Sequence, residues 1–174
     1  MITRIQGKWR DHLSRFSQRL NQMASYVCYL LLGIITCVTV LQVALRYIFN
    51  SPTSWSEEIA LLCLVWFGLI AVAIGIERHE HIAIRFIRDF LPKPLGHILD
   101  IFAQVLMAIF MFVILLNGVN LSSMIGEQVL PASHISKSFL YVPLFVSGAL
   151  GLFNALGNLL LGRLNEIIEE DYND

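Results

Sequence analysis

The sequence predicts an all-α integral membrane protein with four transmembrane helices, and two observations lead to this fold class. The 174 residues are 56% hydrophobic and only 14% charged, too apolar for a globular core beneath a polar surface. Charged residues also fall in blocks, and none lies within 20–45, 59–76, 101–126 or 138–162. The shortest of these runs would be about 27 Å long as a helix, close to the ~30 Å hydrocarbon core of a bilayer. We therefore expect residues 1–174 to form a single membrane domain.

The first predicted element is an amphipathic helix over residues 2–20. Its apolar residues, such as Ile5, Trp9 and Phe16, recur at steps of three or four, with basic residues largely between them. This pattern is typical of a helix that lies in the headgroup region and is held there by anionic lipid. The alternative is a cytoplasmic extension packed on its own chain.

The four spans are expected at 24–45, 58–77, 99–124 and 138–162. Thr36, Thr39 and Gln42 form a mild polar stripe on the first span, which back-bonding hydroxyls and one amide contact between helices would satisfy. A second interfacial helix is expected at 82–91, ended by Pro92 and Pro94, although it could also continue the second span. An acidic cytoplasmic tail, 163–174, ends the chain.

Small residues recur along one face of two spans and predict close helix packing. In the second span they are Gly68, Ala71 and Gly75, and in the fourth they are Ser147, Gly151 and Ala155. Four asparagines within or beside the last two spans are polar enough to join helices, namely Asn117, Asn120, Asn154 and Asn158.

Basic residues are distributed unevenly among the segments between spans. Five precede the first span, four lie at 78–93 and Arg163 follows the last span, whereas the other two loops hold only Arg46 and Lys137. Because cytoplasmic segments carry the excess of Lys and Arg, both termini are expected in the cytoplasm and the Arg46 loop outside. In a bacterial inner membrane that loop would face the periplasm.

Several classes of function are disfavoured by what the spans contain. The cysteines Cys28, Cys37 and Cys63 lie inside spans without a CxxC pair, so no disulfide is expected. His79 and His81 diverge on a helix, and none of the five histidines lies in the middle of an apolar run, so no metal, haem or other cofactor is expected. No span interior holds an ionisable residue, whereas ion-coupled carriers usually place such residues at mid-membrane. We therefore expect neither an enzyme nor a carrier acting alone, and no nucleic-acid partner.

The external turn between the first two spans concentrates charge and aromatic residues. Ser54 and Glu57 have the spacing of a capping box, so Glu57 could be only a helix cap. Arg46 could snorkel to the headgroups, or form a salt bridge to Glu58 or to a partner chain. The hypothesis is a structured external patch of Arg46, Tyr47, Asn50, Trp55 and Glu58.

From Arg46 onward the chain resembles the small membrane subunit of tripartite ATP-independent periplasmic (TRAP) transporters. The resemblance rests on the order and spacing of the residues Arg46, Tyr47, Phe49, Asn50, Trp55, Glu57, Glu58, Trp66, Gly68, His81 and Ile82. It covers essentially the whole chain, and its overall appearance is most similar to sialic-acid systems. One departure is Arg85, where an acidic residue often follows the His-Ile pair, so a cytoplasmic contact through that acid does not carry over.

This resemblance implies a heterodimer with a large membrane subunit that carries substrate and sodium, while a soluble periplasmic protein delivers an organic acid. The chain would then be a scaffold that anchors the static part of the transporter in the inner membrane, in contact with membrane lipids. The alternative is a stand-alone membrane sensor that uses the Arg46–Glu58 turn as its ligand patch.

Overall fold

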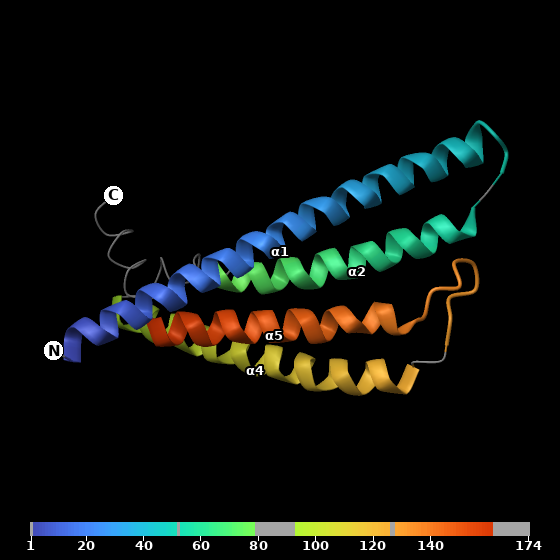
Figure 1. Cartoon of the computed structure of the whole chain (residues 1–174). Helices are drawn as coiled ribbons and strands as arrows, with labels where there is room; N and C mark the ends of the chain where they lie inside the picture. The colour runs from blue at the N-terminus through green and yellow to red at the C-terminus, as the bar shows by residue number, and fades with distance from the viewer. Residues whose placement is uncertain (1, 52, 79–92, 126–127, 162–174) are drawn as a thin grey trace.

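Four long helices make up the computed structural model, which describes residues 2–51, 53–78, 93–125 and 128–161 (Figure 1). They are α1 (Ile2–Tyr47), α2 (Ser54–Glu77), α4 (Lys93–Ile125) and α5 (Ser138–Leu161). Each contains a stretch long and apolar enough to cross a membrane. The predicted all-α fold with four candidate spans is therefore confirmed, while residues 82–91 and 163–174 lie outside the described part.

The helices lie side by side in the order α1, α2, α5, α4 (Figure 1). Consequently α2 and α5 are central, α1 packs mainly on α2, and α4 packs on α5. One end of the array, here called the N-terminal end, holds the start of α1 and the end of α2. The opposite end, the loop end, carries the described connecting residues 48–51, 53 and 128–137.

α1 is one uninterrupted helix, so the residues predicted as an interfacial helix, 2–20, and as the first span, 24–45, belong to the same helix. Residues 20–24 contain neither proline nor glycine, and nothing local stops the helix there. At 46 residues α1 is roughly 69 Å long, more than twice the thickness of the hydrocarbon core. Its first part therefore either projects beyond the span or requires α1 to tilt strongly.

Other boundaries differ by a few residues from those predicted. α2 begins at Ser54 rather than at 58, because its polar first turn is already helical. α4 begins at Lys93 rather than at 99, and Pro94 lies in its first turn. Proline is tolerated there because the first helical N–H groups have no partner inside the helix.

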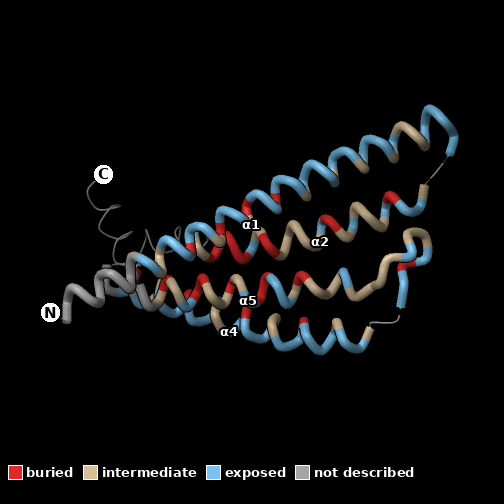
Figure 2. Tube along the Cα trace, in the orientation of Figure 1, coloured by how far each residue is buried: buried red, intermediate tan, exposed pale blue. Residues whose placement is uncertain are grey.

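Buried residues gather where α2 and α5 face their neighbours (Figure 2). Cys28, Ile70 and Ile74 form a cluster between α1 and α2, and a second cluster of Ile76, Met111 and Ala155 joins α2, α4 and α5. On α1 no residue from 29 to 47 is buried. The core therefore holds α2, α5 and α4 together along their length and includes α1 only near the N-terminal end.

The backbones of α4 and α5 approach closely at two glycines. A Cβ atom added to Gly148 would lie 2.8 Å from the backbone nitrogen of Leu115, and one added to Gly118 would lie 2.8 Å from that of Phe145. Such distances exclude any side chain. Lipid is as apolar as leucine, so the hydrophobic effect does not drive two helices together inside a membrane. Small residues instead let the backbones approach closely enough for van der Waals contact.

Candidate functional site

The connection between α1 and α2 is a tight turn that Asn50 makes possible. Asn50 has φ 48°, in the left-handed region that asparagine tolerates better than most side chains. The N–H of Ile48 donates to the Ala44 carbonyl at 2.9 Å and that of Ser51 to the Leu45 carbonyl at 3.0 Å, which ends α1. This turn fixes where the last residues of α1 point.

Arg46 and Tyr47 are exposed on the last turn of α1. The guanidinium carbon of Arg46 lies 5.9 Å from the centroid of the Tyr47 ring, within range of a cation–π contact. Within the described residues the Glu58 carboxylate binds Ala132 and Ser133 instead of Arg46, and a salt bridge from Arg46 to a partner chain stays a prediction. The side chains of Arg46 and Tyr47 form an outward-facing cationic and aromatic surface, and Tyr47 is 74% exposed.

The start of α2 does not form the predicted capping box. Thr53 is the N-cap residue and makes no side-chain cap, while the Ser56 hydroxyl donates to the Thr53 carbonyl at 2.7 Å. Glu57 instead accepts a hydrogen bond from the Gln42 amide at 3.0 Å, linking α2 to α1. Gln42 thus makes the predicted amide contact between helices, and Thr36 back-bonds to the Leu32 carbonyl at 2.9 Å as expected.

Glu58 holds the distant loop between α4 and α5. One carboxylate oxygen accepts from the N–H of Ala132 at 3.0 Å, and the other accepts from the N–H and the hydroxyl of Ser133, both at 2.7 Å. Three donors converging on one carboxylate form a charge-assisted contact that orients the loop. This pairing could not be predicted from the sequence, because nothing local links residue 58 to residues 132 and 133.

The loop over 128–137 is itself compact. Val129 and Ser136 form an antiparallel bridge, and the N–H of Leu130 donates to the Ile135 carbonyl at 2.8 Å. His134 takes a left-handed conformation at φ 56°, which closes the turn. The loop therefore presents a fixed set of backbone donors to Glu58.

The other residues singled out from the sequence lie at different positions along the helices. Trp55 is at the loop end and 37% exposed, whereas Trp66 lies deeper, where its indole N–H donates to the Phe139 carbonyl of α5 at 2.8 Å. Gly68 and Gly75 have no atom within 4 Å of an added Cβ, so no close contact inside this chain requires them to be glycine. Ala71 packs beside the Cys28 cluster. His81 lies outside the described residues.

The second group of polar contacts, which the sequence revealed only in part, joins three helices near the N-terminal end. The side-chain amides of Asn21 and Asn154 hydrogen bond to each other in both directions at 2.8 Å. The Asn154 amide also donates to the Ala73 carbonyl of α2 at 2.9 Å. Asn154 joins helices as predicted, while its partner Asn21 fell between two predicted elements and was missed.

Two more buried amides extend this group. Asn158 donates to the Ile76 carbonyl of α2 at 2.8 Å, and Gln104 of α4 lies 3.4 Å from the Ala155 carbonyl of α5. Each amide bonds to a neighbouring helix, which is how polar groups stabilise helix association in a membrane. By contrast, Asn117 bonds only within its own helix, at 2.8 Å to the Val113 carbonyl.

Within the described residues, no three His, Cys, Asp or Glu side chains are close enough to hold a metal ion. Cys28 and Cys63 are buried, Cys37 is exposed, and all three are free thiols. The polar groups of the two ends make hydrogen bonds between helices and loops. Chemically, this arrangement is suited to holding elements in place.

Comparison with known proteins gives a consistent result. Residues 35–164 match the family described as "Tripartite ATP-independent periplasmic transporters, DctQ component". A candidate TRAP transporter small permease protein of Haemophilus influenzae (strain ATCC 51907 / DSM 11121 / KW20 / Rd) is 29% identical over 149 residues, covering 84% of this chain and 88% of the relative.

Two relatives have names that mention sialic acid. The small permease protein SiaQ of Vibrio cholerae is 31% identical over 98 residues, covering 55% of this chain and 57% of the relative. The permease protein SiaT of Haemophilus influenzae (strain 86-028NP) is 24% identical over 134 residues, covering 77% of this chain. The matched part makes up only 22% of SiaT, which is much longer.

Proposed function

Because the chain belongs to the DctQ family of TRAP transporter small permease subunits, we propose that it is the scaffold subunit of a sodium-driven importer. The large membrane subunit would carry the substrate and sodium, and a periplasmic binding protein would deliver an organic acid. Sialic acid is the compound named for two of the relatives above, and C4-dicarboxylate is named for the small permease protein DctQ of Vibrio cholerae, which is 24% identical over 107 residues. These two compounds are the first substrates to test.

The observation that carries this proposal is how the polar groups inside the helix array are used. Asn21, Asn154 and Asn158 are each 4% exposed or less, and each bonds to another helix of the same chain. Groups used in this way fix helices relative to one another. An ion or anionic substrate would instead need unengaged polar groups or a buried charge at mid-membrane.

The distribution of basic residues supports an orientation with both termini in the cytoplasm. Ten of the twelve Lys and Arg residues lie in the N-terminal segment, in the 78–93 segment or after α5. The loop end, with Arg46 and Lys137, would then face the periplasm. Partners on that side would meet the exposed Arg46, Tyr47 and Trp55, while Glu58 keeps the adjoining loop in place.

The exposed part of this surface has the composition of an interaction site. Trp, Tyr and Arg are the residues most enriched among those that dominate binding energy at protein interfaces. Asn50 and Glu58 would contribute indirectly, the first by shaping the turn and the second by orienting Ala132 and Ser133. Gly68 and Gly75 leave room along α2 that a neighbouring helix of the large subunit could occupy.

Assembly and transport test the proposal together. The chain alone in liposomes is expected to give no organic-acid flux above protein-free liposomes, and flux is expected when the large subunit and binding protein are added. Flux catalysed by this chain alone would disprove the scaffold role, as would failure to bind a large subunit encoded beside it.

The interaction surface is tested with single substitutions in that complex. Trp55→Ala and Arg46→Ala are each expected to weaken assembly with the large subunit or the binding protein roughly tenfold or more. Ile48→Ala is the matched control, because Ile48 is an exposed apolar residue of the same turn outside the proposed surface. If all three variants assemble equally well, the proposed interaction surface is wrong, whereas the scaffold role is unaffected.

A further inference from the structure

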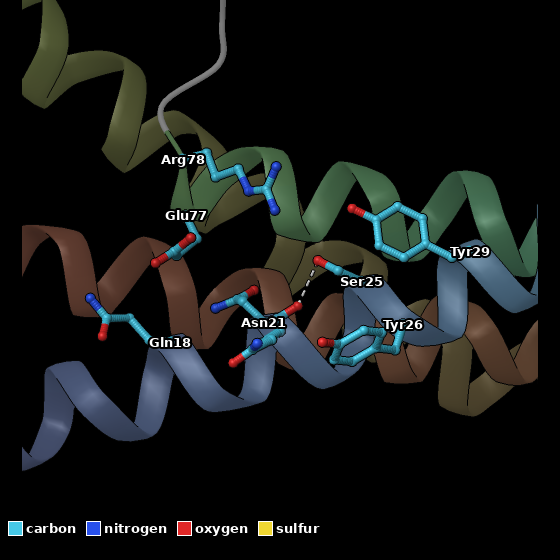
Figure 3. Close-up of a pocket in the computed structure, with 8 residues that line it drawn as sticks. Gln18, Asn21, Ser25, Tyr26, Tyr29, Glu77 and Arg78 are labelled. Atoms are coloured by element: carbon cyan, nitrogen blue, oxygen red, sulfur yellow. Dashed lines mark hydrogen bonds between the residues drawn. The ribbon is translucent and has the colours of Figure 1, made fainter.

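A pocket of about 350 Å³ lies between α1 and the end of α2, near the N-terminal end (Figure 3). Its volume is within the range of about 300–1,000 Å³ that is usual for small-ligand sites. The side chains that give it chemical character are Gln18, Gln22, Tyr26, Tyr29, Glu77 and Arg78. Most of them are exposed, so the pocket opens to the outside of the helix array.

The position of the pocket along the helices places it at a membrane surface. The uncharged run of α2 ends at Ile76, immediately before Glu77 and Arg78, and that of α1 begins at Leu20. Both helices therefore change from polar to apolar at this level. Tyrosines such as Tyr26 and Tyr29 are typical of the same boundary, where an aromatic ring meets lipid and a hydroxyl meets water.

The pocket offers partners for both a negative and a positive group. Figure 3 shows the Arg78 guanidinium and the Tyr29 hydroxyl pointing toward one another, while the Glu77 carboxylate turns to the opposite side, toward Gln18. Guanidinium and hydroxyl donors suit a phosphate, and a carboxylate with an amide oxygen suits an ammonium group. A ligand that fits both sides carries a phosphate and an amine a few bonds apart.

The floor of the pocket is formed by Asn21 and Ser25 of α1. The Ser25 hydroxyl donates to the Asn21 carbonyl at 2.8 Å, and the Asn21 amide bonds to Asn154. Beyond the pocket toward the loop end, Leu30 and Ile34 follow Tyr26 on the same face of α1, and Leu30 is 65% exposed. A polar site thus continues directly into an apolar surface that acyl chains can cover.

We propose that this pocket binds the headgroup of a zwitterionic, amine-bearing phospholipid of the phosphatidylethanolamine class. Arg78 and Tyr29 hold the phosphate, Glu77 and Gln18 hold the ammonium group, and the acyl chains lie against Leu30 and Ile34. Such a lipid ties α1 to α2 at the level where α1 leaves the membrane. This inference does not depend on the scaffold role, because it concerns only the fold of the chain and its contact with the bilayer.

The test uses the full chain, purified in detergent and depleted of lipid. Dioleoyl phosphatidylethanolamine, dioleoyl phosphatidylglycerol, phosphoethanolamine and inorganic phosphate are added separately, and bound lipid and thermal stability are measured by native mass spectrometry and thermal unfolding. Phosphatidylethanolamine is expected to bind and to raise the unfolding temperature more than the other three. Equal or stronger binding of phosphatidylglycerol would overturn the proposal, as would equal stabilisation by inorganic phosphate.

Substitutions then test which side of the pocket holds the phosphate and which side holds the ammonium group. Arg78→Gln is expected to lower the affinity for phosphatidylethanolamine at least tenfold, whereas Arg15→Gln, which removes an exposed cation of α1 outside the pocket, leaves it unchanged. Glu77→Gln is expected to abolish the preference for phosphatidylethanolamine over phosphatidylglycerol. If Arg78→Gln and Arg15→Gln bind the lipid equally, the pocket is not the site.

Tyr29→Phe keeps the test valid even if a charge substitution disturbs folding. Tyr29 is 64% exposed, so removing its hydroxyl leaves the packing of the helices intact. Loss of one hydrogen bond to the phosphate is expected to weaken lipid binding about fivefold. An unchanged affinity in this folded variant would contradict the assignment of the phosphate to the Arg78 side.

Discussion

The two outer helices of the array are attached in different ways. α4 meets α5 backbone to backbone at Gly118 and Gly148, with no room for a side chain at either position. α1 meets α2 and α5 through buried groups only from Ser17 to Cys28, and then diverges from α2 toward the loop end (Figure 1). On α2, Gly68 and Gly75 face open space instead of a close neighbour.

This difference divides the molecule into two parts: a rigid block of α2, α4 and α5, and an attached arm, α1. Helices α2, α5 and α4 are held by dispersion along their length, which tolerates little displacement because packed interiors are dense. α1 is held near the N-terminal end by the Cys28 cluster and the hydrogen bonds between Asn21 and Asn154, and at the loop end by the bond between Gln42 and Glu57. The exposed length of α1 between those ends is therefore the part of the molecule most able to adapt to lipid or to a partner subunit.

The largest effect is expected from adding a methyl group between α4 and α5. In Gly148→Ala the new Cβ would lie 2.8 Å from the Leu115 nitrogen and 2.9 Å from its Cα, and these backbone atoms cannot rotate away. We expect a loss of roughly 2 to 3 kcal/mol in the free energy of unfolding in mixed micelles.

Gly157→Ala is the matched control on the same helix, since nothing lies within 4 Å of its added Cβ. It should gain up to about 1 kcal/mol, because alanine favours a helix more than glycine does. A gain in stability for Gly148→Ala as well would show that α4 and α5 are not in backbone contact.

A smaller but clear effect is expected from cutting the attachment of α1 at the N-terminal end. Asn154→Leu removes the reciprocal bonds with Asn21 and the bond to the Ala73 carbonyl. At about 0.6 kcal/mol for an average side-chain hydrogen bond in a membrane protein, the loss should be roughly 1 to 2 kcal/mol.

Asn117→Leu is the control for this substitution, because the Asn117 amide bonds only to the Val113 carbonyl of its own exposed helix face. It should leave the free energy of unfolding almost unchanged. A double-mutant cycle of Asn21→Leu and Asn154→Leu measures the pair directly, and strictly additive losses would contradict the reciprocal contact.

The sequence predicted the parts of the fold that depend on local composition. Charge-free runs located all four candidate spans, and the small residues Ser147, Gly151 and Ala155 are buried on α5. The elements expected at 2–20 and 24–45 lie in one helix, because the change from basic to apolar residues marks a change of surroundings. The backbone there has no reason to stop being helical.

Contacts between distant segments were the part that the sequence could not supply. Glu58 stood out as a charge at the start of a span, but its partners Ala132 and Ser133 are backbone groups oriented by a loop with a left-handed His134. Asn21 carries a usable signal, since an amide at the edge of an apolar run tends to bond to another helix. Choosing Asn154 as its partner needs the packing of α1 against α5.

The smallest effect is expected at the other attachment of α1. Gln42→Leu removes the 3.0 Å hydrogen bond to Glu57, an exposed contact that should contribute about 0.5 kcal/mol or less to the free energy of unfolding. The distance between spin labels on Val43 and Leu61, in a chain without native cysteines, should nevertheless become more broadly distributed, because Gln42 is the last link between the diverging helices. Thr36→Val is the control, since Thr36 bonds only to the Leu32 carbonyl of its own helix. An unchanged distribution of distances in Gln42→Leu would mean that packing already fixes the loop end of α1. The difference in attachment between α1 and the block of α2, α4 and α5 would then hold only near Asn21.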